Sequence, residues 1–295
     1  MSRVGVCSWS LQPASPTDLA DKVRACGLDA VQLALDPLRT GQWSEADTAR
    51  ALKAAGITIC SGMMAFRGED YSTLESIRRT GGVRPDLDWP ENLDAAEACA
   101  RLAERLGLAL VTFHAGFIPH EAADPVRGIM IDRLRHVVDA FSARGVRVAL
   151  ETGQESAQTL LDALAELDRP LVGANFDPAN MILYAMGDPV ASLRLLARAG
   201  RVAQVHIKDA LPTRTPGTWG EETPAGAGAV DWPAFFRVLR EHAHTPAHPL
   251  ACDLVIERES GGTRLDDVRA AAALVRSHLA PPSPPAPPAR PTSLR

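Results

Sequence analysis

Four side chains that can bind a metal ion follow apolar segments in the second half of the chain. They are Glu151 at the end of VALE, Asp177 at the end of NFD, His206 in QVHIKD and Glu257 at the end of LVIE. Three carboxylates gathered after buried strands repel each other, and a divalent cation removes that cost. One imidazole with three carboxylates suits Mn²⁺, Mg²⁺ or Co²⁺ better than structural zinc. Any one of the four could instead cap a helix, but their occurrence at successive strand ends predicts a metal site.

The segments that end in these residues belong to a longer alternating pattern. Eight apolar or β-branched segments, bounded by turn residues, cover 4–9, 30–35, 57–63, 108–114, 146–151, 171–177, 202–207 and 250–257. Nearly continuous apolar strands are typical of a parallel sheet that is covered on both faces. A doubly wound open sheet also alternates, but no GxGxxG follows the first segment and no GxxxxGK[ST] occurs. We therefore predict an α/β fold, a single (β/α)₈ TIM barrel over residues 1–280, with the polar strand ends around one pocket.

Amphipathic helices are expected between the strands. The clearest begins at Asp124-Pro125 and carries one apolar face from Val126 to Phe141. Further helix starts are predicted at Ser156, at Asp188-Pro189, at 231–233 and at Thr263 with Asp266 as a capping box. The proline-rich segment 281–295, PPSPPAPPARPTSLR, cannot bury an apolar face, so we expect a disordered tail.

Composition narrows the class of protein. The 295 residues are 46% hydrophobic, enough for one large core, and the net charge of −5 argues against a nucleic-acid partner. No apolar run is long enough to span a membrane, and the N-terminal sequence lacks a secretory signal pattern. Five scattered cysteines without a CxxC pair indicate reduced thiols. These features predict a cytoplasmic protein.

The metal-ligand set resembles that of a known group of enzymes. The phrases ALETG, NFDPAN, VHIKDA and LVIERE resemble the xylose isomerase-like superfamily of sugar isomerases and epimerases over nearly the whole chain except the tail. DPANMILYAMGDP and WGEETPAGAGAVDW are similar to a bacterial subgroup described as sugar phosphate isomerase/epimerase. The resemblance implies one divalent ion, Mn²⁺ first and Mg²⁺ or Co²⁺ as alternatives, and a sugar or sugar phosphate substrate. It also implies proton transfer beside a ketose carbonyl, through an enediolate, with Glu151 and Glu257 as the acid/base pair.

Two residues after strand segments are candidates for substrate contact. Many sugar epimerases have histidine three residues after the aspartate of the sixth strand, whereas this chain has Asn180 there. Pentulose-phosphate 3-epimerases resemble it in having asparagine, and the residue could also cap the next helix. His114 ends VTFHAG on the fourth segment and is expected at the same rim, as a substrate contact or as a structural histidine.

Four further side chains complete the predicted substrate site. Lys208 is expected on the same side of its strand as His206, facing substrate or paired with Asp209. Trp9 could wall the sugar or pack in the core. Glycines 217, 220, 226 and 228 predict a flexible loop after the seventh strand, in which Glu222 could close over the site and Arg214 could hold a phosphate.

Other functions remain open at this stage. A lyase, by dehydration or by β-elimination from a 3-keto-glycoside, begins with the same removal of a proton beside a carbonyl. Apurinic endonucleases share the barrel but need further histidines, including one on the second strand and one three residues after the aspartate of the sixth strand. This chain has no histidine before His114 and has Asn180 at the second of these positions. A sugar-binding barrel without catalysis would leave the four ligands without a use. The expected partner is a small sugar, and a homo-oligomer is expected only by analogy with similar barrels.

Overall fold

Eight parallel strands close into a barrel in the computed structural model, which describes residues 3–243 and 252–279. The barrel strands are β1 (Val4–Cys7), β2 (Ala30–Ala34), β3 (Thr58–Met63), β4 (Leu110–Phe113), β5 (Arg147–Glu151), β6 (Gly173–Phe176), β7 (Val202–Ile207) and β10 (Asp253–Ile256). Neighbours follow chain order, and β1 closes the ring by pairing with both β2 and β10. Each predicted strand segment contains one of these strands, so the predicted (β/α)₈ barrel is confirmed.

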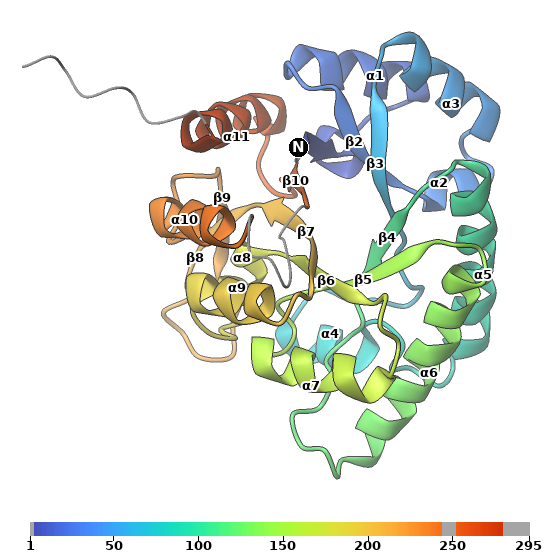
Figure 1. Cartoon of the computed structure of the whole chain (residues 1–295), viewed down its shortest axis with the longest axis vertical. Helices are drawn as coiled ribbons and strands as arrows, with labels where there is room; N and C mark the ends of the chain where they lie inside the picture. Colours follow the sequence, from blue (N-terminus) through green and yellow to red (C-terminus); the bar gives the residue numbers. More distant parts are fainter. Residues whose placement is uncertain (1–2, 244–251, 280–295) are drawn as a thin grey trace, which may run out of the picture.

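Helices surround the barrel, with α5 and α6 on one side and α10 and α11 on the other (Figure 1). A 3₁₀-helix covers Ser8–Leu11, and the α-helices are α1 (Pro16–Ala25), α2 (Asp36–Arg39), α3 (Glu45–Ala54), α4 (Leu74–Thr80), α5 (Trp89–Arg105), α6 (Pro125–Ser142), α7 (Ala157–Leu167), α8 (Pro178–Leu183), α9 (Pro189–Arg198), α10 (Trp232–Ala243) and α11 (Arg264–Leu279). The predicted caps at Asp124, Ser156 and Asp188 accept backbone N–H groups of α6, α7 and α9. The helix predicted from residue 231 begins at Trp232.

Strand side chains alternate between the helices and the barrel interior. Phe176 at the end of β6 contacts Phe235 of α10, with ring centroids 6.0 Å apart. Its neighbour Asn175 points the other way and hydrogen-bonds to Gln204 of β7 across the interior. The apolar core therefore lies between strands and helices, while polar side chains occupy part of the barrel interior.

The segment after β7 contains a small antiparallel hairpin where the sequence predicts a flexible glycine-rich loop. Its strands are β8 (Asp209–Leu211) and β9 (Glu221–Thr223). The buried Asp209 carboxylate accepts hydrogen bonds from the backbone of Gly226, Gly228 and Val230 and from the indole of Trp232. These bonds tie the end of the hairpin to the start of α10.

The proline-rich segment 281–295, predicted to be disordered, lies outside the described residues. Within the described ranges, none of the helices has the length and apolar character needed to cross a membrane.

Candidate metal centre

The structure brings the four predicted metal ligands together at the carboxyl end of the barrel. One ligand atom from each of Glu151, Asp177, His206 and Glu257 lies within 4.8 Å of the others, and all four residues are buried. Glu151 ends β5, Asp177 precedes α8, His206 lies in β7 and Glu257 follows β10. These positions are the ones that strand-end placement in a parallel barrel requires.

The imidazole of His206 faces the carboxylates through Nδ1. This atom lies 3.2 Å from Glu257 Oε2, 3.6 Å from Glu151 Oε1 and 3.8 Å from Asp177 Oδ2. The other ring nitrogen, Nε2, lies 2.8 Å from Gln32 Oε1 and donates its proton there. Nδ1 and Asp177 Oδ2 are buried and have no hydrogen-bond partner. The lone pair of His206 Nδ1 and the three carboxylates face one point, and Nδ1 and Asp177 Oδ2 have no other partner there. This arrangement fits a divalent cation.

The charges around His206 also affect its protonation. Burial alone would lower the pKa of its imidazole, but Cys7, Glu257 and Glu151 outweigh burial and raise that pKa well above its usual value. Burial alone would raise the pKa of Glu257, and Lys208 with His206 instead lowers it to about 2. The carboxylates are thus charged at neutral pH, and their negative charge stabilises either the protonated imidazole of His206 or a bound metal ion.

Two asparagines orient Glu151. Asn180 Nδ2 donates to Glu151 Oε1 at 3.1 Å and Asn175 Nδ2 donates to Oε2 at 3.2 Å. Asn180 approaches closely because Gly153 has no side chain: a Cβ there would lie 2.3 Å from the Cβ of Asn180, and its φ is +126°. Asp177 both caps a helix and faces the site, since Oδ1 accepts the N–H of Ala179 and Asn180 while Oδ2 points to His206. The two sequence interpretations of Asp177 are therefore compatible.

Glu257 is held by a tryptophan and a lysine. Trp9 Nε1 donates to Oε1 at 2.8 Å and Lys208 Nζ donates to Oε2 at 2.9 Å. Lys208 also lies 2.5 Å from Glu259 Oε2 and 3.6 Å from Asp177 Oδ2. The partners of Lys208 are thus Glu257, Glu259 and Asp177, and not Asp209, which the sequence left as an alternative.

A network of polar side chains lies beneath the site inside the barrel, and the sequence analysis did not identify it. Gln32, which accepts from His206, donates to Thr112 Oγ1 at 2.8 Å. Ser61 donates to Gln204, Gln204 to Asn175, and Asn175 to Glu151. A polar residue at alternate positions of otherwise apolar strands, as in VQL, VTF and AQV, is the signal that could have revealed it.

Removal of the Gln32 amide should weaken metal binding. In Gln32→Leu the Nε2 proton of His206 loses its acceptor, so the ring is no longer held with Nδ1 toward the carboxylates. We expect the Mn²⁺ dissociation constant, measured by isothermal titration calorimetry, to rise about 10–100-fold. Ser61→Ala, in the same network but without contact to a ligand, is the control and should change it much less. Equal affinities in the two variants would contradict this role of Gln32.

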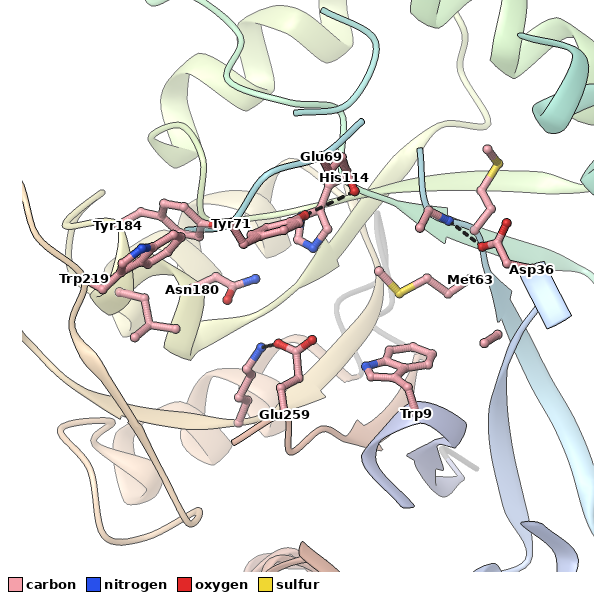
Figure 2. Close-up of a pocket in the computed structure, with 15 residues that line it drawn as sticks. Trp9, Asp36, Met63, Glu69, Tyr71, His114, Asn180, Tyr184, Trp219 and Glu259 are labelled. Carbon is pink, nitrogen blue, oxygen red and sulfur yellow. Dashed lines mark hydrogen bonds and ion pairs between the residues drawn. The ribbon is translucent and has the colours of Figure 1, made fainter. Parts of the chain in front are cut away.

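A cavity of about 540 Å³ (Figure 2) is lined by Asn180 and Lys208, which are hydrogen-bond partners of Glu151 and Glu257, while the four candidate ligands are not among its described lining residues. Four of the predicted substrate residues line it: Trp9, His114, Asn180 and Lys208. His114 Nε2 is 3.5 Å from Glu151 Oε1, so this histidine connects the cavity to the ligand set. The sequence analysis missed several other lining residues, among them Glu69, Tyr71, Tyr184, Trp219 and Glu259. Glu69 accepts the N–H of Gly82 and the hydroxyl of Tyr71, and burial raises the pKa of its carboxyl.

Two predicted substrate residues do not line this cavity. Arg214 is exposed in the hairpin loop and lines a second hollow, which shares Trp219 with the cavity. Glu222 accepts hydrogen bonds from Arg258 and from the backbone N–H of Glu259 instead of facing the cavity. Neither residue is among the described lining residues of this cavity, and their predicted roles in substrate binding stay predictions.

Comparisons with known proteins agree with this architecture. The model of the family described as xylose isomerase-like TIM barrel matches residues 20–275. A xylose isomerase domain protein from Planctomyces limnophilus has a similar structure, with 29% identity, a TM-score of 0.79, and coverage of 88% of this chain and 91% of that chain. Structures described as the probable 3-DHS dehydratase AsbF from Bacillus anthracis (18% identity, TM-score 0.68, 94% and 99% covered) and as L-ribulose 3-epimerase (17%, 0.70, 95% and 95%) share the fold. The search of curated proteins gives no match. By its sequence match and its closed barrel, this chain belongs to the xylose isomerase-like TIM barrel family.

Proposed function

We propose that the protein is a divalent-metal-dependent sugar isomerase or epimerase that moves a proton at the carbon beside a ketose carbonyl, through an enediolate. The observation that carries this proposal is the pair Glu151 and Glu257. They come from β5 and β10, which are separated by β6 and β7 in the barrel, and each has an oxygen within 3.6 Å of the unpartnered Nδ1 of His206. Two carboxylates beside one cavity can remove a proton from one face of a carbon and return it to the other.

The surroundings give the two glutamates different tasks in this mechanism. Glu151 receives two neutral amide donors and no ammonium; burial alone would raise the pKa of its carboxyl, but the imidazoles of His114 and His206 outweigh burial and lower that pKa. Glu257 receives the ammonium of Lys208, which stabilises its charged form. A bound divalent ion, Mn²⁺, Mg²⁺ or Co²⁺, would supply Lewis-acid polarisation of the substrate carbonyl, held by the four residues. We assign first proton removal to Glu151 and proton return to Glu257.

A lyase is the second candidate, and Glu69 favours it. Elimination needs a group that donates a proton to the leaving oxygen, and a raised pKa favours the protonated carboxyl that can donate. Glu69 lines the cavity, and burial raises its pKa. The same removal of a proton by Glu151 would begin both reactions.

Turnover in deuterated water separates the two reactions. Mn²⁺-loaded protein is incubated with a panel of ketoses, their 5- and 6-phosphates and 3-keto-glycosides. For an isomerase or epimerase we expect one solvent deuterium at the carbon beside the carbonyl, detected by NMR and mass spectrometry. A lyase gives an enone absorbance or a free aglycone instead. A sugar that is converted with no deuterium from solvent would point to hydride transfer and contradict the proposal.

A further inference from the structure

The loop after the seventh barrel strand is a common phosphate site in TIM barrels, and here a carboxylate of the chain fills it. Asp209 Oδ2 accepts the N–H of Gly226 at 2.9 Å and of Gly228 at 3.2 Å, and Oδ1 accepts the N–H of Val230 at 3.1 Å. Backbone N–H groups of such a glycine-rich turn are the donors that would cradle a phosphate. These three already have an anionic partner.

The loop after the eighth barrel strand is filled in the same way. Glu222 Oε1 accepts the N–H of Glu259 at 2.9 Å and lies 3.5 Å from the nitrogen of Ser260. It also accepts from the guanidinium of Arg258 at 2.9 Å, and Asp267 binds the Nε of the same arginine at 2.9 Å. A guanidinium and two backbone N–H groups are typical of a phosphate site. Here the carboxylate of Glu222 takes the place of that ligand.

Among the described lining residues of the cavity, the two groups that can carry a positive charge, Lys208 and His114, both face carboxylates; His114 Nε2 lies 3.5 Å from Glu151 Oε1. Lys208 is the ammonium that lines the cavity, and carboxylates of Glu257, Glu259 and Asp177 surround that ammonium. The carboxyl groups of Glu69 and Glu259 line the same space. A phosphate ester with a charge of about −1.5 to −2 would lose water there and meet further negative charge.

The side of the cavity near α8 is aromatic instead. Figure 2 shows Tyr71, Tyr184 and Trp219 on one side, with Trp9 and Glu259 across the cavity from them. The rings of Tyr184 and Trp219 pack edge to face with centroids 4.9 Å apart, and Tyr71 is 43% exposed. Large aromatic surfaces that remain accessible beside a polar centre gain free energy when an apolar group covers them.

We infer that the site takes an uncharged, unphosphorylated sugar that carries an apolar substituent, with the substituent against Tyr71, Tyr184 and Trp219. The inference rests on the proposed function only for the position of the reacting carbon beside the four ligands. The filled phosphate sites, the paired lysine and the aromatic side each support it separately.

Matched ligand pairs test the inference through binding, without turnover. Dissociation constants for the Mn²⁺-loaded protein are measured by isothermal titration calorimetry for phenyl against methyl 3-keto-β-glucoside, and for fructose against fructose 6-phosphate. We expect the phenyl compound to bind at least about 10-fold more tightly than the methyl compound, because the ring buries apolar surface. Fructose 6-phosphate should bind at least about 10-fold more weakly than fructose.

Two variants assign these preferences to residues. Trp219→Ala should lower the phenyl-to-methyl ratio, because one of the three aromatic surfaces is lost, with the loss confined to binding of the phenyl compound. Arg214→Ala, outside the cavity, should change neither pair. Tighter binding of fructose 6-phosphate than of fructose, above all if Arg214→Ala abolishes it, would overturn the inference, and so would equal binding of phenyl and methyl compounds. If a sugar phosphate is the tightest ligand and takes up deuterium, the inference fails and the proposed function stands. If the expected binding ratios are found but no sugar is converted, the inference stands and the proposed function fails.

Discussion

Glu151→Gln and Glu257→Gln are each expected to lower turnover about 10²–10⁴-fold while metal affinity falls much less. Glutamine has the size of glutamate and keeps one oxygen toward His206, but it cannot accept a proton from carbon. At Glu151 the oxygen that faces His206 still accepts from Asn180, whereas Asn175 loses its acceptor because the second oxygen becomes an NH₂ group. The measurement is turnover at saturating Mn²⁺ on the substrate found in the deuterium assay, with the Mn²⁺ dissociation constant determined for each variant.

The two glutamine variants should also separate the removal of the proton from its return. If Glu151 removes the first proton, Glu151→Gln stops deuterium from entering the substrate, whereas Glu257→Gln allows exchange at the original position with slow formation of product. Glu97→Gln changes an exposed carboxylate that is paired with Arg101, and it is the control for a general effect of removing one charge. Turnover near the wild-type value in both active-site variants would eliminate the mechanism with two glutamates.

His206→Ala is expected to have its main effect on metal affinity. The substitution removes Nδ1, which faces all three carboxylates, and leaves Gln32 Oε1 with only the thiol of Cys7 as a donor. The Mn²⁺ dissociation constant should therefore rise by more than the about 10–100-fold that loss of an outer hydrogen bond costs. Excess Mn²⁺ should restore part of the activity, because Glu151 and Glu257 are still present.

His136→Ala is the matched control for this experiment, since His136 lies exposed on α6 next to Trp89. We expect it to bind Mn²⁺ as the wild type does. Should His206→Ala bind Mn²⁺ with unchanged affinity, His206 is not a ligand, and the unpartnered Nδ1 needs another explanation.

The barrel and the clustering of the four candidate ligands were predictable because both follow from local pattern. Apolar strands of the length seen in β5 and β6 are visible in sequence, and a carboxylate directly after them can only lie at the rim, as Glu151 and Asp177 do. Lys208, two residues after His206, was expected on the same side of the strand for the same reason. Its partners Glu257 and Glu259 could not be predicted, because those contacts join residues about 50 positions apart.

The substrate side of the site was less predictable because it consists of loops. Nothing local determines which way Arg214 or Glu222 points, and the hydrogen bonds of Glu222 depend on how the hairpin packs against the loop after β10. The aromatic residues Tyr71 and Trp219 come from separate loops and meet only in the folded chain. Sequence pattern predicts strand ends well, but loop side chains depend on tertiary contacts.

The bond between Trp9 and Glu257 joins residues 248 positions apart, and this affects how the protein is made. On the ribosome, strands β1 to β7 emerge first, with three of the four ligands but with β1 and β7 as open edges. Unpaired edges can associate with other nascent chains until β10 fills the gap. Glu257 arrives with that last strand, so the complete metal centre forms only when the barrel closes. If the four residues bind a metal ion as proposed, a truncated chain that ends before β10 lacks Glu257 and carries an incomplete site.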